Sequence, residues 1–372
     1  MRIRASRPDP PRASASDALA LLREVAAEPR PAGSEAEDRV RQLARERLER
    51  AGFDVREEWF GYSAFPGMWA TPAGGAVAAM TLATASVLGA HGHPLPALVV
   101  LALAAALLGV AALYMARRGV LDMPLLRAEG ANLVATRGRP RVWLVAHLDS
   151  KSQPVPMLLR VAGVVVTALA WIVLLVLAAR AVAGADAPGA WRALGIAGVV
   201  AALPVMASVV GARSAGAVDD ASGVATVLLA VSRLAPDLSV GVLLTTAEEL
   251  GMAGARAFAR VRAPAIAINV DGVDDRGPVI CMRHGRGARA RVGVTHGAAS
   301  VGTHVRDTPT IPGLLTDGVA LADAGWSAVT LSRGTLGTLA RIHRRADDVE
   351  RMRGTGVEAM ARLVAAAARE IA

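Results

Sequence analysis

Residues 142–166 read VWLVAHLDSKSQPVPMLLRVAGVVV, and this stretch joins two kinds of structure without a break. Its first five residues are apolar and lead to His147, which predicts a strand buried on both faces. His147 and Asp149 then offer nitrogen and oxygen donors of the kind that bind metals. From Met157 onward the sequence begins a long apolar run that predicts a membrane span. A polar turn able to bind a metal is therefore expected directly beside a bilayer.

Four long apolar stretches dominate the composition, which is 53% hydrophobic with a mean hydropathy of +0.40. They cover residues 68–90, 96–116, 161–179 and 193–212, and none contains a charged residue. Each has about the ~20 residues needed to cross a bilayer. Buried helices of a large soluble core are the alternative, but such helices rarely run this long without a charge. We expect two transmembrane hairpins, which return the chain to the same side of the membrane.

Arginine supplies almost all of the positive charge, and the net charge is +9. Five basic residues flank the spans on the side of the polar sequence: Arg117, Arg118, Lys151, Arg160 and Arg213. The opposite turns offer Arg180 and Arg192, together with Asp186. The excess of basic residues predicts that the polar domain lies on the cytoplasmic face. Nucleic-acid binding is not indicated, because aromatic residues are only 3% and no basic helix with interleaved aromatics occurs.

The N-terminal residues MRIRASRPDPPRASASDALA contain no apolar core, so they are not typical of a secretory signal and are expected to form a short disordered arm. Cys281 is the single cysteine, which excludes an internal disulfide and a thiolate metal site. Such cysteine usage is compatible with a reducing compartment.

Outside the hairpins the sequence predicts one α/β domain, a sheet covered on both faces by crossover helices. The expected segments are an N-terminal arm with the first helices and strand (1–67), hairpin 1 (68–116), the middle part of the α/β domain (117–154), hairpin 2 (155–212) and the last part of the α/β domain (213–372). Strands are expected at 53–60, 132–136, 142–147, 239–247, 265–271 and 328–332. Ser34 and Glu37 have the spacing of a capping box that opens a helix ended by Gly52. Residues 283–291, RHGRGARAR, are expected to form a solvated loop.

Acidic and histidine residues follow these strands or, for Asp219, Asp220 and His343, precede helices, and all are expected at the sheet edge where sites form in α/β proteins. They are His147, Asp149, Asp219, Asp220, Glu248, Glu249, Asp271 and His343. Taken singly, most have ordinary explanations: a surface turn, a helix start or an exposed loop. Asp271 is the exception, because it ends an apolar strand, where a carboxylate needs a partner or a metal. Their occurrence together at strand ends indicates a metal site.

Five motifs in order resemble the M28 family of co-catalytic zinc aminopeptidases. They are AHLDS (146–150), GAVDDASGVATVLLA (216–230), TTAEELGMAGARAFA (245–259), NVDGV (269–273) and IHRRADD (342–348). Residues 30–55 also resemble the opening helix and strand of that family. The resemblance covers nearly all of the chain outside the hairpins. It implies a zinc-peptidase-like three-layer α/β/α sandwich with a mostly parallel central sheet, and two bound zinc ions.

By this resemblance His147 and Glu249 bind one zinc, and Asp149 orients His147. Asp271 and His343 hold the second zinc, Asp219 bridges both, and Glu248 is the general base. Two metals about 3.5–4 Å apart would share a hydroxide and polarise a peptide carbonyl. The segment around Asp317 departs from the family pattern: Gly318, Leu321 and Ser327 replace the usual His, Phe and Pro. These changes affect the substrate wall rather than the metal ligands.

The sequence thus predicts a membrane-anchored zinc aminopeptidase acting on peptides. One alternative keeps the fold but uses a single zinc for a glutaminyl-cyclase-like acyl transfer. Another is a non-catalytic membrane receptor or scaffold, which loss of ligands would signal. A transporter is disfavoured because the spans lack paired internal charges. The hairpins are interpreted as anchors in preference to elements that present membrane-bound substrates. The sequence does not determine the oligomeric state.

Overall fold

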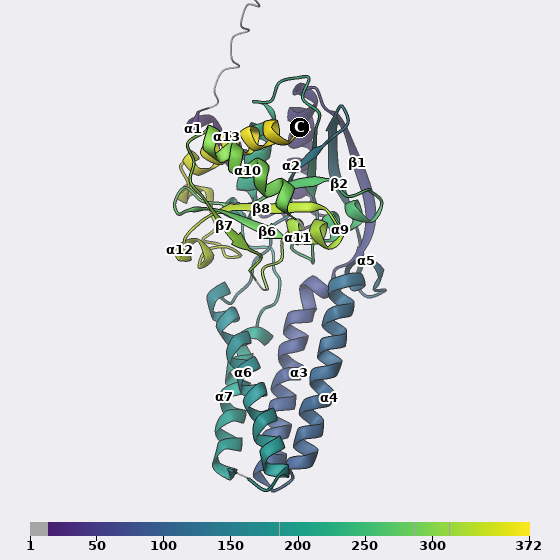
Figure 1. Ribbon diagram of the computed structural model, residues 1–372, viewed down its shortest axis with the longest axis vertical. Helices are drawn as coiled ribbons and strands as arrows, with labels where there is room; N and C mark the ends of the chain where they lie inside the picture. Colours follow the sequence, from purple (N-terminus) through teal and green to yellow (C-terminus); the bar gives the residue numbers. More distant parts are fainter. Residues whose placement is uncertain (1–13, 186, 286, 312) are drawn as a thin grey trace, which may run out of the picture.

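The computed structural model describes residues 14–185, 187–285, 287–311 and 313–372. The structure has four long apolar helices. They form a bundle with the α/β domain at one end, which gives the molecule an elongated shape (Figure 1). The expected N-terminal arm falls mainly on residues 1–13, outside the described residues.

Eight strands form one mixed sheet in the order β1-β2-β4-β3-β5-β8-β6-β7. Their bounds are β1 Asp54–Ser63, β2 Arg127–Arg137, β3 Val142–His147, β4 Val240–Thr245, β5 Ile266–Val273, β6 Val279–His284, β7 Val305–Pro309 and β8 Ser327–Arg333. The central strands β4, β3, β5 and β8 run parallel. Strands β1, β2 and β6 join by antiparallel pairing, and β7 runs parallel to β6. The parallel centre brings the carboxyl ends of four strands to one edge.

Helices cover both faces of the sheet, which confirms the predicted three-layer class (Figure 1). Their bounds are α1 Ala15–Val25, α2 Glu35–Arg50, α8 Ser222–Val231, α9 Ala253–Arg260, α10 Ala288–Ser300, α11 Asp317–Asp323 and α13 Thr355–Ile371. Alternate side chains of a strand point to opposite faces of the sheet. In β3, Leu144 packs with α8 and α13, whereas Trp143 and Val145 pack with α9 and α11. Two short elements, η1 Met115–Gly119 and α5 Val120–Asp122, follow α4 (Pro94–Tyr114) at the end of the first hairpin, and three more belong to the domain: η2 Ala217–Ala221, α12 Leu336–Leu339 and η3 Val349–Arg351.

The six predicted strands are present, but β6 and β7 were missed and the expectation for residues 283–291 was wrong. Residues Arg283 and His284 end β6, and α10 begins at Ala288. This helix buries small residues rather than large apolar ones, so its sequence lacks a clear apolar stripe. Gly297 allows the close approach of α13, because a Cβ there would lie 2.5 Å from the Ala367 nitrogen.

The bundle contains α3 Phe65–Ala90, α4 Pro94–Tyr114, α6 Met157–Val182 and α7 Pro188–Met206. Four helices here are long and apolar enough to cross a membrane. Their inner surfaces pack around Leu82, Leu101, Leu174 and Trp191. Their outer surfaces leave large apolar side chains exposed, such as Leu107 at 70%. An apolar surface of this extent is unusual on a soluble monomer.

Each hairpin interrupts the α/β domain. The first leaves after β1 and returns before β2, and the second leaves after β3 and returns before α8. Helix α7 ends at Met206 rather than at 212, and the residues after it lead the chain back to the α/β domain without helical structure. Among them, Gly211 pairs with Ser152 in an isolated antiparallel bridge that joins the start of the second hairpin to its end.

Candidate metal centre

The predicted ligands converge at the carboxyl edge of the central strands. His147 ends β3, Asp271 lies in β5, and Glu249 follows β4. Asp219 lies in η2 at the start of α8, and His343 lies between α12 and η3. The donor atoms of His147, Asp219 and Asp271 lie within 4.8 Å of one another. The donor atoms of Asp219, Glu249 and His343 form a second group of the same kind.

Asp219 belongs to both groups and faces a different histidine with each oxygen. Its Oδ1 lies 3.1 Å from His147 Nε2, and its Oδ2 lies 2.9 Å from His343 Nε2. A carboxylate placed between two imidazoles in this way has the geometry of a ligand shared by two metal ions. The adjacent peptide bond between Asp219 and Asp220 is cis.

The structure corrects one expectation about the ligands: Asp271 groups with His147, and Glu249 groups with His343. The resemblance had led us to expect the reverse pairing. Glu249 turns toward His343 because Lys151 Nζ holds its Oε2 at 2.6 Å, and that oxygen lies 3.5 Å from His343 Nε2. The order of residues along the chain does not reveal this orientation.

Crowded buried carboxylates dominate the electrostatics of the site. Burial and the Asp219 carboxylate raise the pKa of Asp271 to about 7. Burial raises the pKa of Glu248 well above its usual range, and the carboxylates of Glu249 and Asp271 add to this effect. In contrast, burial opposes ionisation of Glu249, but Lys151 and then His343 lower its pKa to about 2. So many carboxylates in one place require cations to ionise together.

The residues present fit divalent metal ions. The donors are nitrogen and oxygen without sulfur, and each group combines one histidine with two carboxylates. In addition, Glu249 Oε1 is buried without a hydrogen-bond partner, so it is free to bind a metal. A buried polar atom of this kind is costly unless it finds a partner.

Asp149 lies against His147, as expected, and makes a second set of contacts that was not expected. Its backbone oxygen lies 3.0 Å from His147 Nδ1, whereas its carboxylate Oδ1 is 3.6 Å from that nitrogen. Both carboxylate oxygens accept backbone N–H bonds, from Glu248 and from Glu249, each at 3.1 Å. Asp149 thus fixes the loop of the two glutamates and holds His147 by its main chain. The carboxylate of Asp347 similarly accepts the N–H groups of Val218 and Asp219 at 2.8 Å and 3.2 Å.

Three residues beside this site have left-handed backbone conformations that are uncommon outside glycine. They are Ala247, Met252 and His343, with φ of 54°, 61° and 60°. Such backbone conformations cost about 1–3 kcal/mol each and persist only where the surroundings enforce them. The loop of Glu248 and Glu249 is therefore held in place by its packing.

Sequence reasoning missed Arg30, which is fully buried behind the metal centre. Its guanidinium donates to the carbonyl oxygens of Leu148, Val25, Ala215 and Gly216. These contacts join the turn after β3 to the loop that carries Asp219. No sequence pattern marks Arg30 for this role, because its partners are backbone carbonyls.

Replacement of Arg30 by methionine is expected to lower the free energy of unfolding by about 3 kcal/mol or more. Three buried carbonyls and the partly buried carbonyl of Ala215 would lose this donor, and each unsatisfied buried acceptor costs about 1–3 kcal/mol. Thermal unfolding of the detergent-purified protein measures the effect. Arg39→Met is the control, because the Arg39 side chain is 57% exposed and should tolerate the change. An Arg30→Met protein as stable as the wild type would contradict this role.

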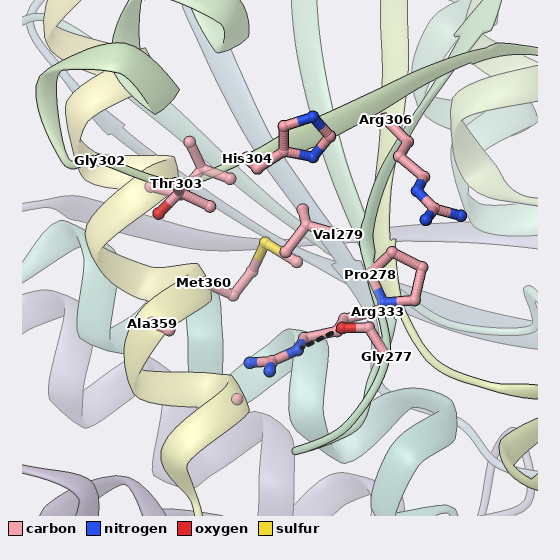
Figure 2. A pocket seen from close by; sticks show the side chains of 12 residues that line it. Gly277, Pro278, Val279, Gly302, Thr303, His304, Arg306, Arg333, Ala359 and Met360 are labelled. Atoms are coloured by element: carbon pink, nitrogen blue, oxygen red, sulfur yellow. Dashed lines mark hydrogen bonds between the residues drawn. The ribbon is translucent and has the colours of Figure 1, made fainter.

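A hollow of about 380 Å³ lies elsewhere in the domain, between the ends of β6 and β7 and helix α13 (Figure 2). Its lining includes Val279, His304, Arg333 and Met360, and none of the predicted metal ligands. Arg333 donates to the Gly277 oxygen across its rim, at 3.1 Å. This hollow is separate from the metal centre.

The fold and the donor set define a metallopeptidase-like hydrolase. Residues 131–368 match peptidase family M28, and the chain belongs to this family. A search of curated proteins found no match.

Solved structures of similar fold include two aminopeptidases. The aminopeptidase from Aneurinibacillus sp. strain AM-1 is 13% identical with a TM-score of 0.58, covering 97% of this chain and 94% of that chain. A zinc aminopeptidase from Bacillus subtilis is 13% identical with a TM-score of 0.56, covering 97% and 95%. A glutaminyl cyclase from Fimbriiglobus ruber is 14% identical with a TM-score of 0.55, covering 99% of each chain. At these identities the likeness shows the fold alone.

Proposed function

We propose that this protein is a membrane-anchored, zinc-dependent aminopeptidase that removes N-terminal residues from peptides. The observation that carries the proposal is the position of Asp219 between His147 and His343, with a complete donor group on each side. The zinc aminopeptidase from Bacillus subtilis, which has the same fold, is consistent with this activity.

His147, Asp219 and Asp271 would hold one zinc ion, and Asp219, Glu249 and His343 the other. When bound, a zinc pair acts as a Lewis acid on the peptide carbonyl and makes water more acidic. Asp149 and Lys151 keep the ligand side chains oriented, through the backbone of the glutamate loop and through Glu249. Partners of this kind commonly change metal affinity or activity about 10–100-fold when removed.

Glu248 is the proposed general base. Its Oε2 lies 4.0 Å from His147 Nε2, so its carboxylate reaches the metal centre without belonging to either donor group. Burial raises its pKa, which favours uptake of a proton from the attacking water. The same carboxyl group would then pass this proton to the leaving amine. Asp317 is buried nearby, with an Oδ1 that has no partner, and it is a candidate to receive a substrate ammonium group.

A glutaminyl cyclase is the second candidate, since two solved structures of this fold carry that name. The presence of two complete donor groups sharing Asp219 favours the two-zinc hydrolase. The non-catalytic alternative is disfavoured because the chain keeps each predicted ligand and Glu248.

Hydrolysis of aminoacyl-anilides and short peptides by zinc-loaded protein tests this function. The panel should include the same peptides with a blocked N-terminus and peptides that begin with glutamine. Release of free N-terminal residues only from unblocked peptides supports an aminopeptidase. Conversion of N-terminal glutamine to its cyclic form without release of a residue would indicate the cyclase instead. If no peptide changes although zinc is bound, the proposed reaction is wrong.

The membrane location is part of the proposal and rests on the four apolar helices. The basic residues near the α/β domain favour a cytoplasmic position for this domain. A reporter that is active only in the cytoplasm, fused after Ala372, is expected to give signal. A signal from a reporter that is active only outside the cytoplasm would reverse the orientation.

A further inference from the structure

Both membrane hairpins contact the loops of the metal centre at the points where they meet the α/β domain. In the first hairpin, Gly67 lies in the first turn of α3 against the backbone of Leu250, which follows Glu249 in the chain. A Cβ added to Gly67 would lie 2.3 Å from the Leu250 Cα and 2.6 Å from its carbonyl carbon. Helix α3 therefore packs on the glutamate loop with no intervening side chain.

The end of the first hairpin reaches the same loop. Val120, in α5, is buried and packs against Gly251. A Cβ added to Gly251 would lie 2.8 Å from the Val120 Cγ2. Val120 also belongs to an apolar cluster with Ala247 and Ala253, and Met68 of α3 packs against this cluster. The loop that carries Glu248 and Glu249 is thus enclosed by both ends of the hairpin.

The second hairpin contacts the loop of His343. Arg160, in the first turn of α6, places Nη2 3.4 Å from His343 Nδ1. The buried Gln153, just before α6, donates its backbone N–H to the His343 oxygen at 2.8 Å. Its side chain donates to the oxygen of Ser208, just after α7, at 3.3 Å. The His343 loop is therefore bonded to the start of this hairpin and, through Gln153, to its end.

We propose that the two hairpins hold the loops of the metal centre in position, in addition to anchoring the protein. Gly67 and Val120 position the glutamate loop, and Gln153 and Arg160 position His343. These are positioning residues, because each acts through a residue that would touch the metals or the substrate. Ala247 and Met252 hold uncommon left-handed conformations, so this loop depends on the packing that the hairpin supplies. The inference builds on the proposed zinc-dependent hydrolysis.

The test compares two glycine substitutions in α3. Gly67→Ala forces the Leu250 backbone to move, whereas Gly74→Ala meets no atom within 4 Å. Gly67→Ala is expected to lower kcat about tenfold or more, since small misplacements of catalytic groups have large effects. Its KM and zinc content are expected to stay close to those of Gly74→Ala, whereas its thermal midpoint is expected to be lower, because the Leu250 backbone must shift to make room. Equal kcat values for the two variants would overturn the proposal.

Two methionine substitutions keep the test decisive if Gly67→Ala does not fold. Met68→Ala removes packing beside Ala247, whereas Met80→Ala shortens a side chain that is 62% exposed in the same helix. We expect a several-fold lower kcat for Met68→Ala and no change for Met80→Ala. An equal loss of kcat in both variants, or no loss in either variant, would contradict the proposal.

A spectroscopic measurement separates this inference from the proposed activity. Protein loaded with Co²⁺ in place of zinc reports ligand geometry through its visible absorption, whether or not any peptide is cleaved. Gly67→Ala is expected to change this spectrum, because Glu249 adjoins Leu250, and Gly74→Ala is expected to leave it unchanged. If the wild type binds Co²⁺ but cleaves no peptide, a changed spectrum still supports the positioning role. Identical spectra would overturn it.

Discussion

Replacement of Glu248 by glutamine is expected to lower kcat by roughly 10³-fold while leaving the bound zinc in place. Glutamine keeps the size of the side chain but cannot accept the proton of the attacking water. Glu248 lies outside both donor groups, so metal binding should survive the change. Its backbone N–H bond to Asp149 does not depend on the side chain, so the loop should also stay in place.

The measurement combines kcat on an unblocked aminoacyl-anilide with zinc content determined by mass spectrometry. Glu35→Gln is the matched control, because the Glu35 side chain is 95% exposed on α2. Retention of more than about a tenth of the wild-type kcat would show that another group takes the proton. Loss of zinc in the Glu248→Gln protein would instead move Glu248 into the ligand set.

The positions of the candidate ligands along the chain were accessible from sequence because parallel strands end at one edge. The run 142–147 matches β3 residue for residue, since a strand buried on both faces is a continuous apolar run. Once β3, β4 and β5 are recognised, His147, Glu249 and Asp271 must lie near one another. The loops that carry Asp219 and His343 were placed by the resemblance to known motifs and not by periodicity.

Which ligands share a metal site could not be predicted from the sequence in the same way. Lys151 was interpreted only as a basic residue flanking a span, yet its ammonium orients Glu249 toward His343. Arg30 carried no visible signal, because its partners are backbone carbonyls from three separate segments. Contacts of this kind depend on tertiary structure, which a pattern of residue types does not encode. The same holds for Gly67, whose importance follows from one close approach to Leu250.

Strands β6 and β7 and helix α10 were not predicted from the sequence for a different reason. β7 is the edge strand of the sheet and β6 lies next to it, and in both strands burial is partial and residues such as Arg283 and Arg306 are exposed. Helix α10 packs through glycine and alanine, which carry little apolar signal. In contrast, each of the four bundle helices contains a long run without charged residues, so their number and approximate bounds could be predicted from composition.

Replacement of Asp219 by asparagine is expected to weaken both zinc sites at once. Asp219 supplies one oxygen to each donor group, and the amide offers one oxygen and no negative charge. We therefore expect purified Asp219→Asn protein to contain less than about one zinc ion per chain and to lack measurable activity. Zinc stabilises the folded state by mass action, so its loss should also lower the thermal midpoint.

Asp271→Asn provides the decisive comparison, because Asp271 belongs only to the group of His147. This variant is expected to lose one zinc ion and to keep the ion held by Glu249 and His343. Zinc content measured across a titration distinguishes the two variants. If Asp219→Asn also loses a single ion, Asp219 is not shared, and the two-zinc centre proposed here is wrong. If both variants keep two ions, the carboxylates do not act as the ligands that their geometry indicates.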